Sequence, residues 1–257
     1  MKTSLHTVFA AVLLSGVANA QITLVHDVAV PAYIANAVAD PARPPDQVAR
    51  DANRKPGEAI AFAGLKPGDR VGDFMPGSGY FTRIFSRVVG PGGHVYAYIP
   101  QEEIDNCPPG EVAGSRALID DRNYTNVTVT TGPVNGYGAP EKLDMVWTAQ
   151  NYHDLHDSFM GPANLTVLDA RIFHLLRRGG VFLVIDHVAE PGSGVRDTDT
   201  LHRIDPAVIV KEVEAAGFKL VAQSDMLRNP ADTHTLFVFD PGIRGRTDQV
   251  VLKFVRP

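Results

Sequence analysis

Short apolar segments alternate with single helical segments through most of this chain of 257 residues. The expected strands lie at 71–74, 94–99, 127–131, 143–148, 181–185, 218–224 and 249–255, with a further candidate at 236–239. The expected helices lie at 58–63, 80–89, 111–121, 164–178 and 206–216. Neighbouring parallel strands need a crossover connection, usually a helix, so single helices between strands indicate parallel pairing. We therefore predict a doubly wound α/β fold around a mostly parallel sheet.

The turn Pro76-Gly77-Ser78-Gly79 separates the first of these strands from the helix at 80–89. In an open α/β sheet, ligands bind beyond the carboxyl ends of the central strands. Glycine allows the backbone to approach a ligand closely, and the first turn of a helix presents free amides to an anion. We therefore predict that Asp73, Gly77 and Gly79 border the main cavity.

Charge and composition exclude several classes of protein. Lys and Arg number 24 against 29 Asp and Glu, so the net charge is −5 and there is no basic excess for contacts with nucleic-acid phosphates. Hydrophobic residues make up 44% and charged residues 21%, as in globular rather than disordered proteins. The one cysteine, Cys107, allows neither an internal disulfide nor a cysteine metal cluster. A small molecule is the expected partner.

Residues 1–20 have the order of features found in a secretory signal peptide. Lys2 supplies a positive charge, 8–17 is an apolar run, and Ala18-Asn19-Ala20 offers small residues to a signal peptidase before Gln21. This run is too short to span a membrane, and no later segment is long and apolar enough to do so. We expect cleavage after Ala20 and export to a periplasm or out of the cell.

The rest of the chain is expected to form one domain. A lead-in segment at 21–55, with a helix entry at Pro44-Pro45-Asp46, precedes the α/β domain at 56–257. The connection at 226–248 is long for a compact domain. It is interpreted either as a lid over the site or as a surface excursion packed on the sheet edge.

Three segments carry a resemblance to a known family. They are Val71-Gly72-Asp73-Phe74-Met75-Pro76-Gly77-Ser78-Gly79-Tyr80-Phe81-Thr82, Leu143-Asp144-Met145-Val146-Trp147 and Leu176-Arg177-Arg178-Gly179-Gly180-Val181. In order and spacing they resemble the motifs of class I S-adenosylmethionine-dependent methyltransferases. Asn151-Tyr152-His153-Asp154-Leu155 and Thr200-Leu201-His202-Arg203 resemble segments shared by a group of exported predicted methyltransferases.

The resemblance implies a seven-stranded sheet with an antiparallel last strand and a site for S-adenosylmethionine. It implies that the cofactor contacts Asp73, Gly77, Ser78, Gly79 and Tyr80, with its methionine carboxylate near the first turn of the helix. The implied reaction is methyl transfer to a small acceptor such as an aromatic molecule.

The chain departs from the family pattern at three positions. Met75 stands where the family usually has glycine, and Ile99 where an acid normally binds the ribose. Pro133 follows the third strand where an acid is often found near the adenine. Glu102 and Glu103 are the acids that could reach the ribose instead.

Histidines follow the expected fourth and fifth strands and the next loop. The candidate catalytic residues are His153, His156, His187, His202, Asp154 and Tyr152. An imidazole titrates near pH 6.5, so it can accept or donate a proton at working pH. Asp154, Asp157 and Asp186 could orient such a base. The alternative is that these histidines are hydrogen-bonded structural residues of loops.

Aromatic residues near these histidines fall into two groups. Tyr152 and Phe159 are candidate contacts for a substrate, whereas Trp147 is expected in the core. A metal site from His153, His156 and His187 is the weaker interpretation, because zinc needs a well-defined third ligand. We expect no metal.

Three functions remain open. The first is methyl transfer from S-adenosylmethionine, with a base such as His153. The second is a lyase or isomerase that works without S-adenosylmethionine, using the histidines for acid–base chemistry in the same cavity. The third is a non-catalytic protein that binds a small ligand. The glycine turn favours the first, whereas the missing acids and the expected export favour the second.

Overall fold

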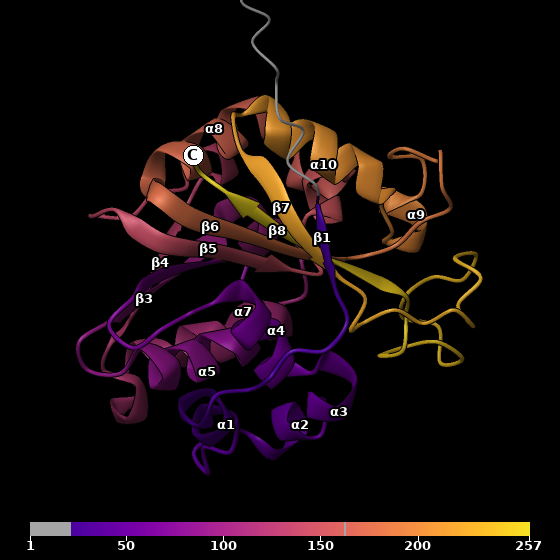
Figure 1. The fold of residues 1–257 in the computed structure, drawn as a ribbon. Helices are drawn as coiled ribbons and strands as arrows, with labels where there is room; N and C mark the ends of the chain where they lie inside the picture. Colours follow the sequence, from indigo (N-terminus) through magenta and orange to yellow (C-terminus); the bar gives the residue numbers. More distant parts are fainter. Residues whose placement is uncertain (1–21, 162) are drawn as a thin grey trace, which may run out of the picture.

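The computed structural model describes residues 22–161 and 163–257, so the expected signal peptide at 1–20 lies outside the described residues. An eight-stranded sheet forms the centre, in the order β1-β7-β8-β6-β5-β2-β3-β4 (Figure 1). The strands are β1 (Thr23–Val25), β2 (Arg70–Phe74), β3 (His94–Pro100), β4 (Val127–Gly132), β5 (Leu143–Ala149), β6 (Leu176–His187), β7 (Lys219–Ser224) and β8 (Gln249–Val255).

The pairing confirms the predicted doubly wound sheet. β6, β5, β2, β3 and β4 pair in parallel, whereas β8 runs antiparallel between β6 and β7. The expectation of seven strands was wrong, because the lead-in adds β1, which pairs in parallel with β7 at the sheet edge. The candidate strand at 236–239 was also wrong, since those residues form turns and irregular loop.

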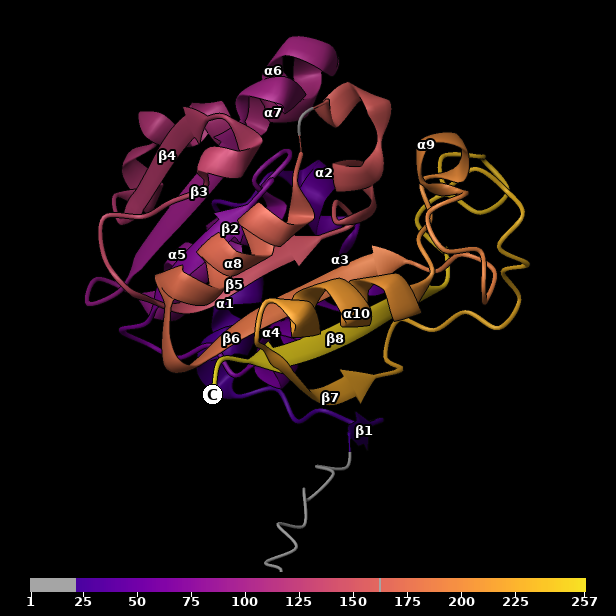
Figure 2. The same ribbon diagram turned by 90° about the horizontal axis from the view of Figure 1, so that it is seen from above.

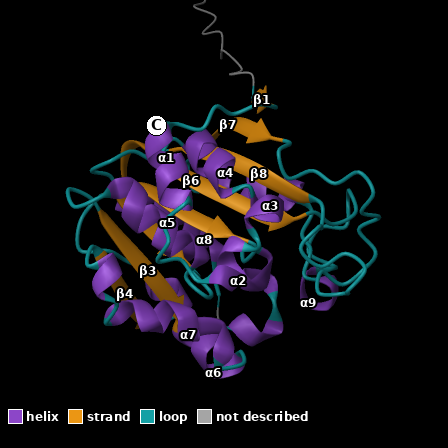
Figure 3. Ribbon diagram, turned by 90° about the horizontal axis from the view of Figure 1, so that it is seen from below, coloured by secondary structure: helices purple, strands orange, loops and turns teal. Residues whose placement is uncertain are grey.

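Helices cover both faces of the sheet. The α-helices are α1 (Ala32–Val38), α2 (Pro45–Val48), α3 (Asp51–Arg54), α4 (Pro56–Ala63), α5 (Tyr80–Val89), α6 (Gln101–Asn106), α7 (Gly110–Arg116), α8 (Leu165–Leu175), α9 (Thr198–Leu201) and α10 (Pro206–Ala215). The 3₁₀ helices are η1 (Ala117–Ile119), η2 (Arg122–Tyr124), η3 (Val134–Gly136), η4 (His153–His156) and η5 (Ser158–Met160). Figure 3 shows α1, α4 and α5 over one face, and Figure 2 shows α8 and α10 over the other.

Each face of the sheet has its own hydrophobic core. Trp147 of β5 is fully buried on the α5 side, where it contacts the rings of Phe81 and Phe85, as expected for a core residue. On the other face, Leu168 and Ile209 bring α8 and α10 onto the strands. Packing on both faces explains why the central strands read as nearly continuous apolar runs.

The helix expected at 164–178 ends earlier than predicted, at Leu175. Gly179 and Gly180 lie within β6 rather than after a helix. The amide of Gly179 donates to the carbonyl of Arg256 at 2.8 Å, and the amide of Arg256 donates to the carbonyl of Gly180 at 2.9 Å. Because these backbone groups bond to the end of the last strand, the glycine pair becomes part of the sheet.

The loop at 225–248 and α9 lie together beyond the carboxyl end of β6 (Figure 2). The amide of Val238 in this loop donates to the carbonyl of Leu201 in α9 at 3.2 Å. Within the described residues, no helix is long and apolar enough to cross a membrane.

Candidate active site

A cavity of about 410 Å³ lies beyond the carboxyl ends of β2, β5 and β6. A volume of several hundred Å³ is typical of a site for a small molecule. Its wall combines α3, the turn after β2, the segments that follow β5 and β6, and part of the 225–248 loop. The fold therefore brings together segments from almost the whole length of the chain.

Four of the five predicted cofactor residues line this cavity, namely Asp73, Gly77, Ser78 and Tyr80. Gly77 has a φ of 54°, and a Cβ there would meet nothing within 4 Å. Gly79 does not line the cavity. A Cβ on Gly79 would lie 2.8 Å from Nη1 of Arg83 and 3.0 Å from Cδ1 of Leu118, so it faces packed side chains.

Asp73 and Met75 belong to the motif at 71–82, where they shape the end of β2 and the turn that follows it. Oδ2 of Asp73 accepts a hydrogen bond from the Thr82 hydroxyl at 2.6 Å, which ties the end of β2 to α5. Burial raises the pKa of Asp73 to about 7. Met75 has a φ of 58°, in the left-handed region, which explains why the family pattern has glycine at this position.

Arg54, at the end of α3, places a guanidinium in the cavity wall. Its Nη2 donates to Oε1 of Gln150 at 2.6 Å, and its Cζ lies 4.6 Å from the centre of the Tyr80 ring. Among the described residues, no carboxylate lies within ion-pair distance of Arg54. Burial and repulsion from Arg50 lower the pKa of Arg54 to about 9. A half-buried cation without a paired carboxylate favours an anionic group on the ligand.

Arg54 was not among the predicted site residues, because the lead-in segment that contains it carries no motif. The one available signal was weak: Arg50 and Arg54 are four residues apart, which places both on one face of a helical segment. Gln150, directly after β5, and Phe239, in the 225–248 loop, also line the cavity and were not predicted from the sequence.

The positions expected to bind a ribose and an adenine lack acids, as the sequence indicates. Ile99 is fully buried at the end of β3, and Pro133 directly follows β4. Glu102 accepts a hydrogen bond from the amide of Val134 at 2.9 Å. Glu103 lines the cavity, so it is the one of the two acids that could contact a ribose there.

Two of the predicted histidines, His153 and His202, meet beside Asp154 on the cavity wall. Nε2 of His153 lies 3.1 Å from Nδ1 of His202 and 3.1 Å from Oδ1 of Asp154. Nδ1 of His202 lies 3.3 Å from the same carboxylate oxygen. On the other side of its ring, Nδ1 of His153 donates to Oδ1 of Asp186 at 2.7 Å. The backbone amide of His153 also donates to Oδ2 of Asp186, at 2.8 Å, which fixes the ring in this orientation.

The charges around these side chains are set by burial and by each other. Burial disfavours a charged His153, but the carboxylates of Asp186 and Asp154 outweigh it and raise the pKa of His153 well above its usual value. Burial also opposes ionisation of Asp154, yet the charge of His153 and the hydrogen bonds from the two histidines lower its pKa to about 2. For His187, burial and the nearby positive charges of His153 and Arg203 hold the pKa well below its usual value.

Tyr152 and His156, predicted as catalytic, do not line the cavity. The Tyr152 hydroxyl is buried and donates to Oδ2 of Asp169 in α8 at 2.9 Å. Oε2 of Glu212 in α10 lies 3.2 Å from that hydroxyl and 3.2 Å from Nε2 of His156. These contacts connect η4 to two helices instead of to a ligand. Of the four histidines predicted as catalytic, His153, His187 and His202 line the cavity and His156 does not.

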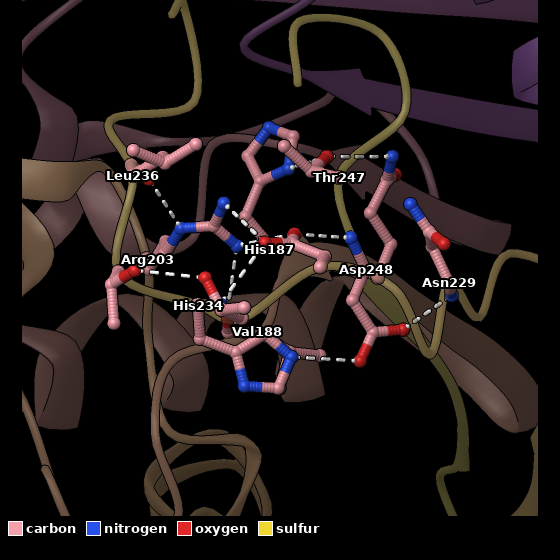
Figure 4. A network of polar contacts seen from close by, with 12 residues as sticks. His187, Val188, Arg203, Asn229, His234, Leu236, Thr247 and Asp248 are labelled. Atoms are coloured by element: carbon pink, nitrogen blue, oxygen red, sulfur yellow. Dashed lines mark hydrogen bonds and ion pairs between the residues drawn. The ribbon is translucent and has the colours of Figure 1, made fainter. Parts of the chain in front are cut away.

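The 225–248 loop is fixed to the end of β6 by a buried polar network (Figure 4). Nη1 and Nη2 of Arg203 donate to the two carboxylate oxygens of Asp232 at 2.9 and 3.1 Å. The ring of His187 contacts the Thr247 hydroxyl at 2.7 Å. Phe239 from this loop lines the cavity, so the loop forms part of the wall of the site.

Comparisons with known proteins place the fold. The chain matches no protein-family model and no curated protein sequence. It is similar to a crystal structure described as a SAM-dependent methyltransferase from Aquifex aeolicus, with a TM-score of 0.56 and 17% identity. That match covers 80% of this chain and 98% of the other.

Two further solved structures share the fold. The glycopeptide N-methyltransferase MtfA, solved in complex with S-adenosylmethionine, matches with a TM-score of 0.52 and 18% identity over 79% of this chain and 87% of that one. The [4+2]-cyclase SpnF matches with a TM-score of 0.56 and 16% identity over 80% of this chain and 82% of that one. These similarities, with the observed strand order, show that the chain has the Rossmann-like fold of class I S-adenosylmethionine-dependent methyltransferases.

Proposed function

We propose that this chain binds S-adenosylmethionine in the cavity and transfers its methyl group to a small acceptor. The position of Arg54 carries the proposal. Its guanidinium is half-buried, has no paired carboxylate among the described residues, and shares a cavity wall with Gly77. A bound carboxylate there would receive charge-assisted hydrogen bonds in a site shielded from water.

The remaining wall fits the cofactor in part. Gly77 leaves open space for a close approach, and Glu103 could accept hydrogen bonds from ribose hydroxyls. The side chain of Ile99 cannot accept a hydrogen bond from the ribose hydroxyls, whereas the family pattern has an acid at this position. We therefore expect binding to depend strongly on the carboxylate end of the molecule.

The histidine cluster and the phenylalanines of the 225–248 loop are the residues expected to contact the methyl acceptor. When bound, S-adenosylmethionine would supply an electrophilic methyl group. An acceptor with an O–H or N–H group loses a proton when it is methylated, and the imidazole of His202 lines the cavity where that proton can be accepted. Phe237 and Phe239 lie 5.4 and 5.8 Å from the His202 ring, centre to centre, and form an apolar edge suited to an aromatic acceptor.

Calorimetric titration of S-adenosylmethionine into the full chain tests the binding step. We expect Arg54→Met to weaken binding by ~10- to 100-fold, because a charge-assisted hydrogen bond contributes about 1.5–3 kcal/mol. Arg178→Met is the matched control, since Arg178 is exposed at the start of β6 and does not line the cavity. Equal affinity in the two variants, or no binding by the unmodified chain, would contradict the proposal.

A second candidate function is a lyase or isomerase reaction without S-adenosylmethionine. Two observations favour it: His153, His202 and Asp154 line the cavity, and the position expected to bind the ribose is Ile99, which is fully buried and carries no acid. Product formation from candidate acceptors, with and without added S-adenosylmethionine, separates the two. Turnover without it that stops in His202→Asn would favour the second function.

We also propose that the chain is exported, on the strength of the sequence at 1–20 alone. Intact-mass measurement of protein from the cell envelope should give an N-terminus at Gln21. Protein that keeps Met1 and stays in the cytosol would overturn this proposal.

A further inference from the structure

We propose that His153, His202, Asp154 and Asp157 form a binding site for a divalent transition-metal ion, with Zn²⁺ as the best-fitting candidate. The site does not depend on S-adenosylmethionine, so the inference goes beyond the proposed function. It also differs from the set of histidines that the sequence suggested, because His156 and His187 have other partners.

The separations between the potential ligand atoms match those around one metal ion. A metal about 2.1 Å from each ligand holds neighbouring ligand atoms roughly 3.0 Å apart at octahedral angles and 3.4 Å apart at tetrahedral angles. Nε2 of His153, Nδ1 of His202 and Oδ1 of Asp154 are separated by 3.1, 3.1 and 3.3 Å. One ligand atom from each of these residues and from Asp157 lies within 4.8 Å of the others.

The buried carboxylate of Asp157 is an independent sign of a missing cation. Asp157 is 3% exposed, and neither of its oxygens has a hydrogen-bond partner among the described residues. Burial raises the pKa of Asp157, and the Thr198 hydroxyl is close enough to oppose that rise, but its single proton also has the carbonyl of Val195 as an acceptor at 3.1 Å. Nδ1 of His202 lies 3.9 Å from Oδ2 of Asp157, outside hydrogen-bond range. A buried carboxylate of this kind is costly unless it is paired or binds a metal.

Asp186 prepares His153 for this role. Because Nδ1 of His153 donates to Asp186, Nε2 is left on the side of the ring that faces His202 and Asp154. Histidines that bind metals are typically oriented in this way by a carboxylate, which also makes the ring a stronger ligand. Two imidazoles with carboxylates are a donor set that suits Zn²⁺, and two ionised carboxylates would balance its charge.

A hydrogen-bonded chain of the same residues is the competing explanation. One proton shared between Nε2 of His153 and Nδ1 of His202 accounts for their separation of 3.1 Å. It supplies nothing to the oxygens of Asp157, whereas a metal ion would satisfy all four side chains together. His153, Asp154 and His202 also line the cavity, so an ion there would keep a coordination position open to a ligand.

Two titrations of the full chain test the metal site. The protein is first stripped of metal with a chelator and kept free of S-adenosylmethionine. Zn²⁺ binding is then measured by calorimetry and Co²⁺ binding by visible absorption. We expect one Zn²⁺ per chain and a Co²⁺ spectrum with imidazole and carboxylate ligands. His202→Asn and Asp154→Asn should each weaken Zn²⁺ binding by ~100-fold or more, and Asp186→Asn by ~10- to 100-fold.

His156→Asn is the matched control, because His156 belongs to the same 3₁₀ helix but contacts Glu212. It should bind Zn²⁺ as the unmodified chain does. Thermal unfolding of each variant without metal checks that it is folded, and the partly exposed Asp154 gives a second variant if His202→Asn does not fold. Absence of saturable binding, or equal affinities in His202→Asn and His156→Asn, would overturn the metal site without bearing on S-adenosylmethionine.

Discussion

Backbone strain is concentrated at residues that line the cavity. Met75, Gln150 and His202 have φ values of 58°, 68° and 52°, in the left-handed region that side chains with a Cβ disfavour by about 1–2 kcal/mol each. Residues held in such conformations tend to cluster at functional sites. Two of these residues make contacts of the site, Gln150 with Arg54 and His202 with His153, which help to hold the strained backbone.

Substitutions at the two glycines of the turn should have different effects. Gly79→Ala would place a Cβ against buried Arg83 and Leu118, so we expect it to lower the free energy of unfolding by about 2 kcal/mol or more. Gly77→Ala meets open space and should cost about 1 kcal/mol of backbone strain. Gly77→Ala should weaken ligand binding more, since Gly77 lines the cavity. Urea unfolding and calorimetry measure both effects, and the reverse order in stability would contradict the assignment.

At the level of elements, η4 is tied to α8 and α10 by Tyr152, Asp169 and Glu212. Burial raises the pKa of Asp169 to about 7. The folded chain therefore keeps a proton on Asp169 at pH values where the unfolded chain has lost it. This contribution to stability is complete below about pH 4 and is lost as the pH rises through about 7.

We expect Asp169→Asn to remove this pH dependence. The quantity to follow is the difference in the free energy of unfolding, unmodified chain minus variant. This difference should fall by at most about 4 kcal/mol between pH 4 and pH 8. Chemical unfolding at a series of pH values measures the difference. Asp120→Asn, at an exposed position, is the control. A difference that stays constant or rises with pH would refute the role of Asp169.

The attachment of the 225–248 loop should depend on its buried ion pair. Arg203→Met leaves the carboxylate of Asp232 without its partner in a buried position, so we expect a loss of about 3–5 kcal/mol in the free energy of unfolding. Arg228→Met removes a partly exposed ion pair with Asp248 and should cost about 1 kcal/mol or less. Urea unfolding of the two variants compares them. Similar losses would mean that the Arg203 pair does not hold the loop.

Most of the elements follow from local sequence patterns. The alternation of apolar segments and helical spacing predicts the central strands, and the need for crossovers predicts their parallel pairing. Two elements depend on distant partners instead. Gly179 and Gly180 form part of β6 because they bond to Arg256, and β1 forms because β7 leaves an edge open beside it.

For the whole molecule, the site could be predicted where residues directly follow the central strands. Gly77 after β2 and His153 after β5 follow this rule and line the cavity, whereas Gly79 does not. Arg54 and Phe239 could not be predicted in this way, because their positions depend on how α3 and the 225–248 loop pack against the rest of the chain. Nothing local in either segment indicates that packing.

The lead-in segment is an integral part of the molecule, so deletion of residues 22–55 should prevent stable folding. Ile34 of α1 is fully buried in the core on the α5 side, and Asp51 accepts a hydrogen bond from the Tyr80 hydroxyl at 2.6 Å. Circular dichroism and thermal unfolding of the truncated chain test this. A cooperative transition close to that of the full chain would show that 56–257 folds on its own.

The residues that line the cavity range along the chain from Arg50 to Phe239. β1, near the N-terminus, pairs with β7, near the C-terminus. Contacts between residues so far apart in sequence close large loops, and they slow folding. The site can form only after nearly all of the chain has emerged from the ribosome, or from a translocation channel if the chain is exported. Any ligand must then be acquired where folding finishes, and recovery of ligand binding in a refolding experiment would report the completion of the fold.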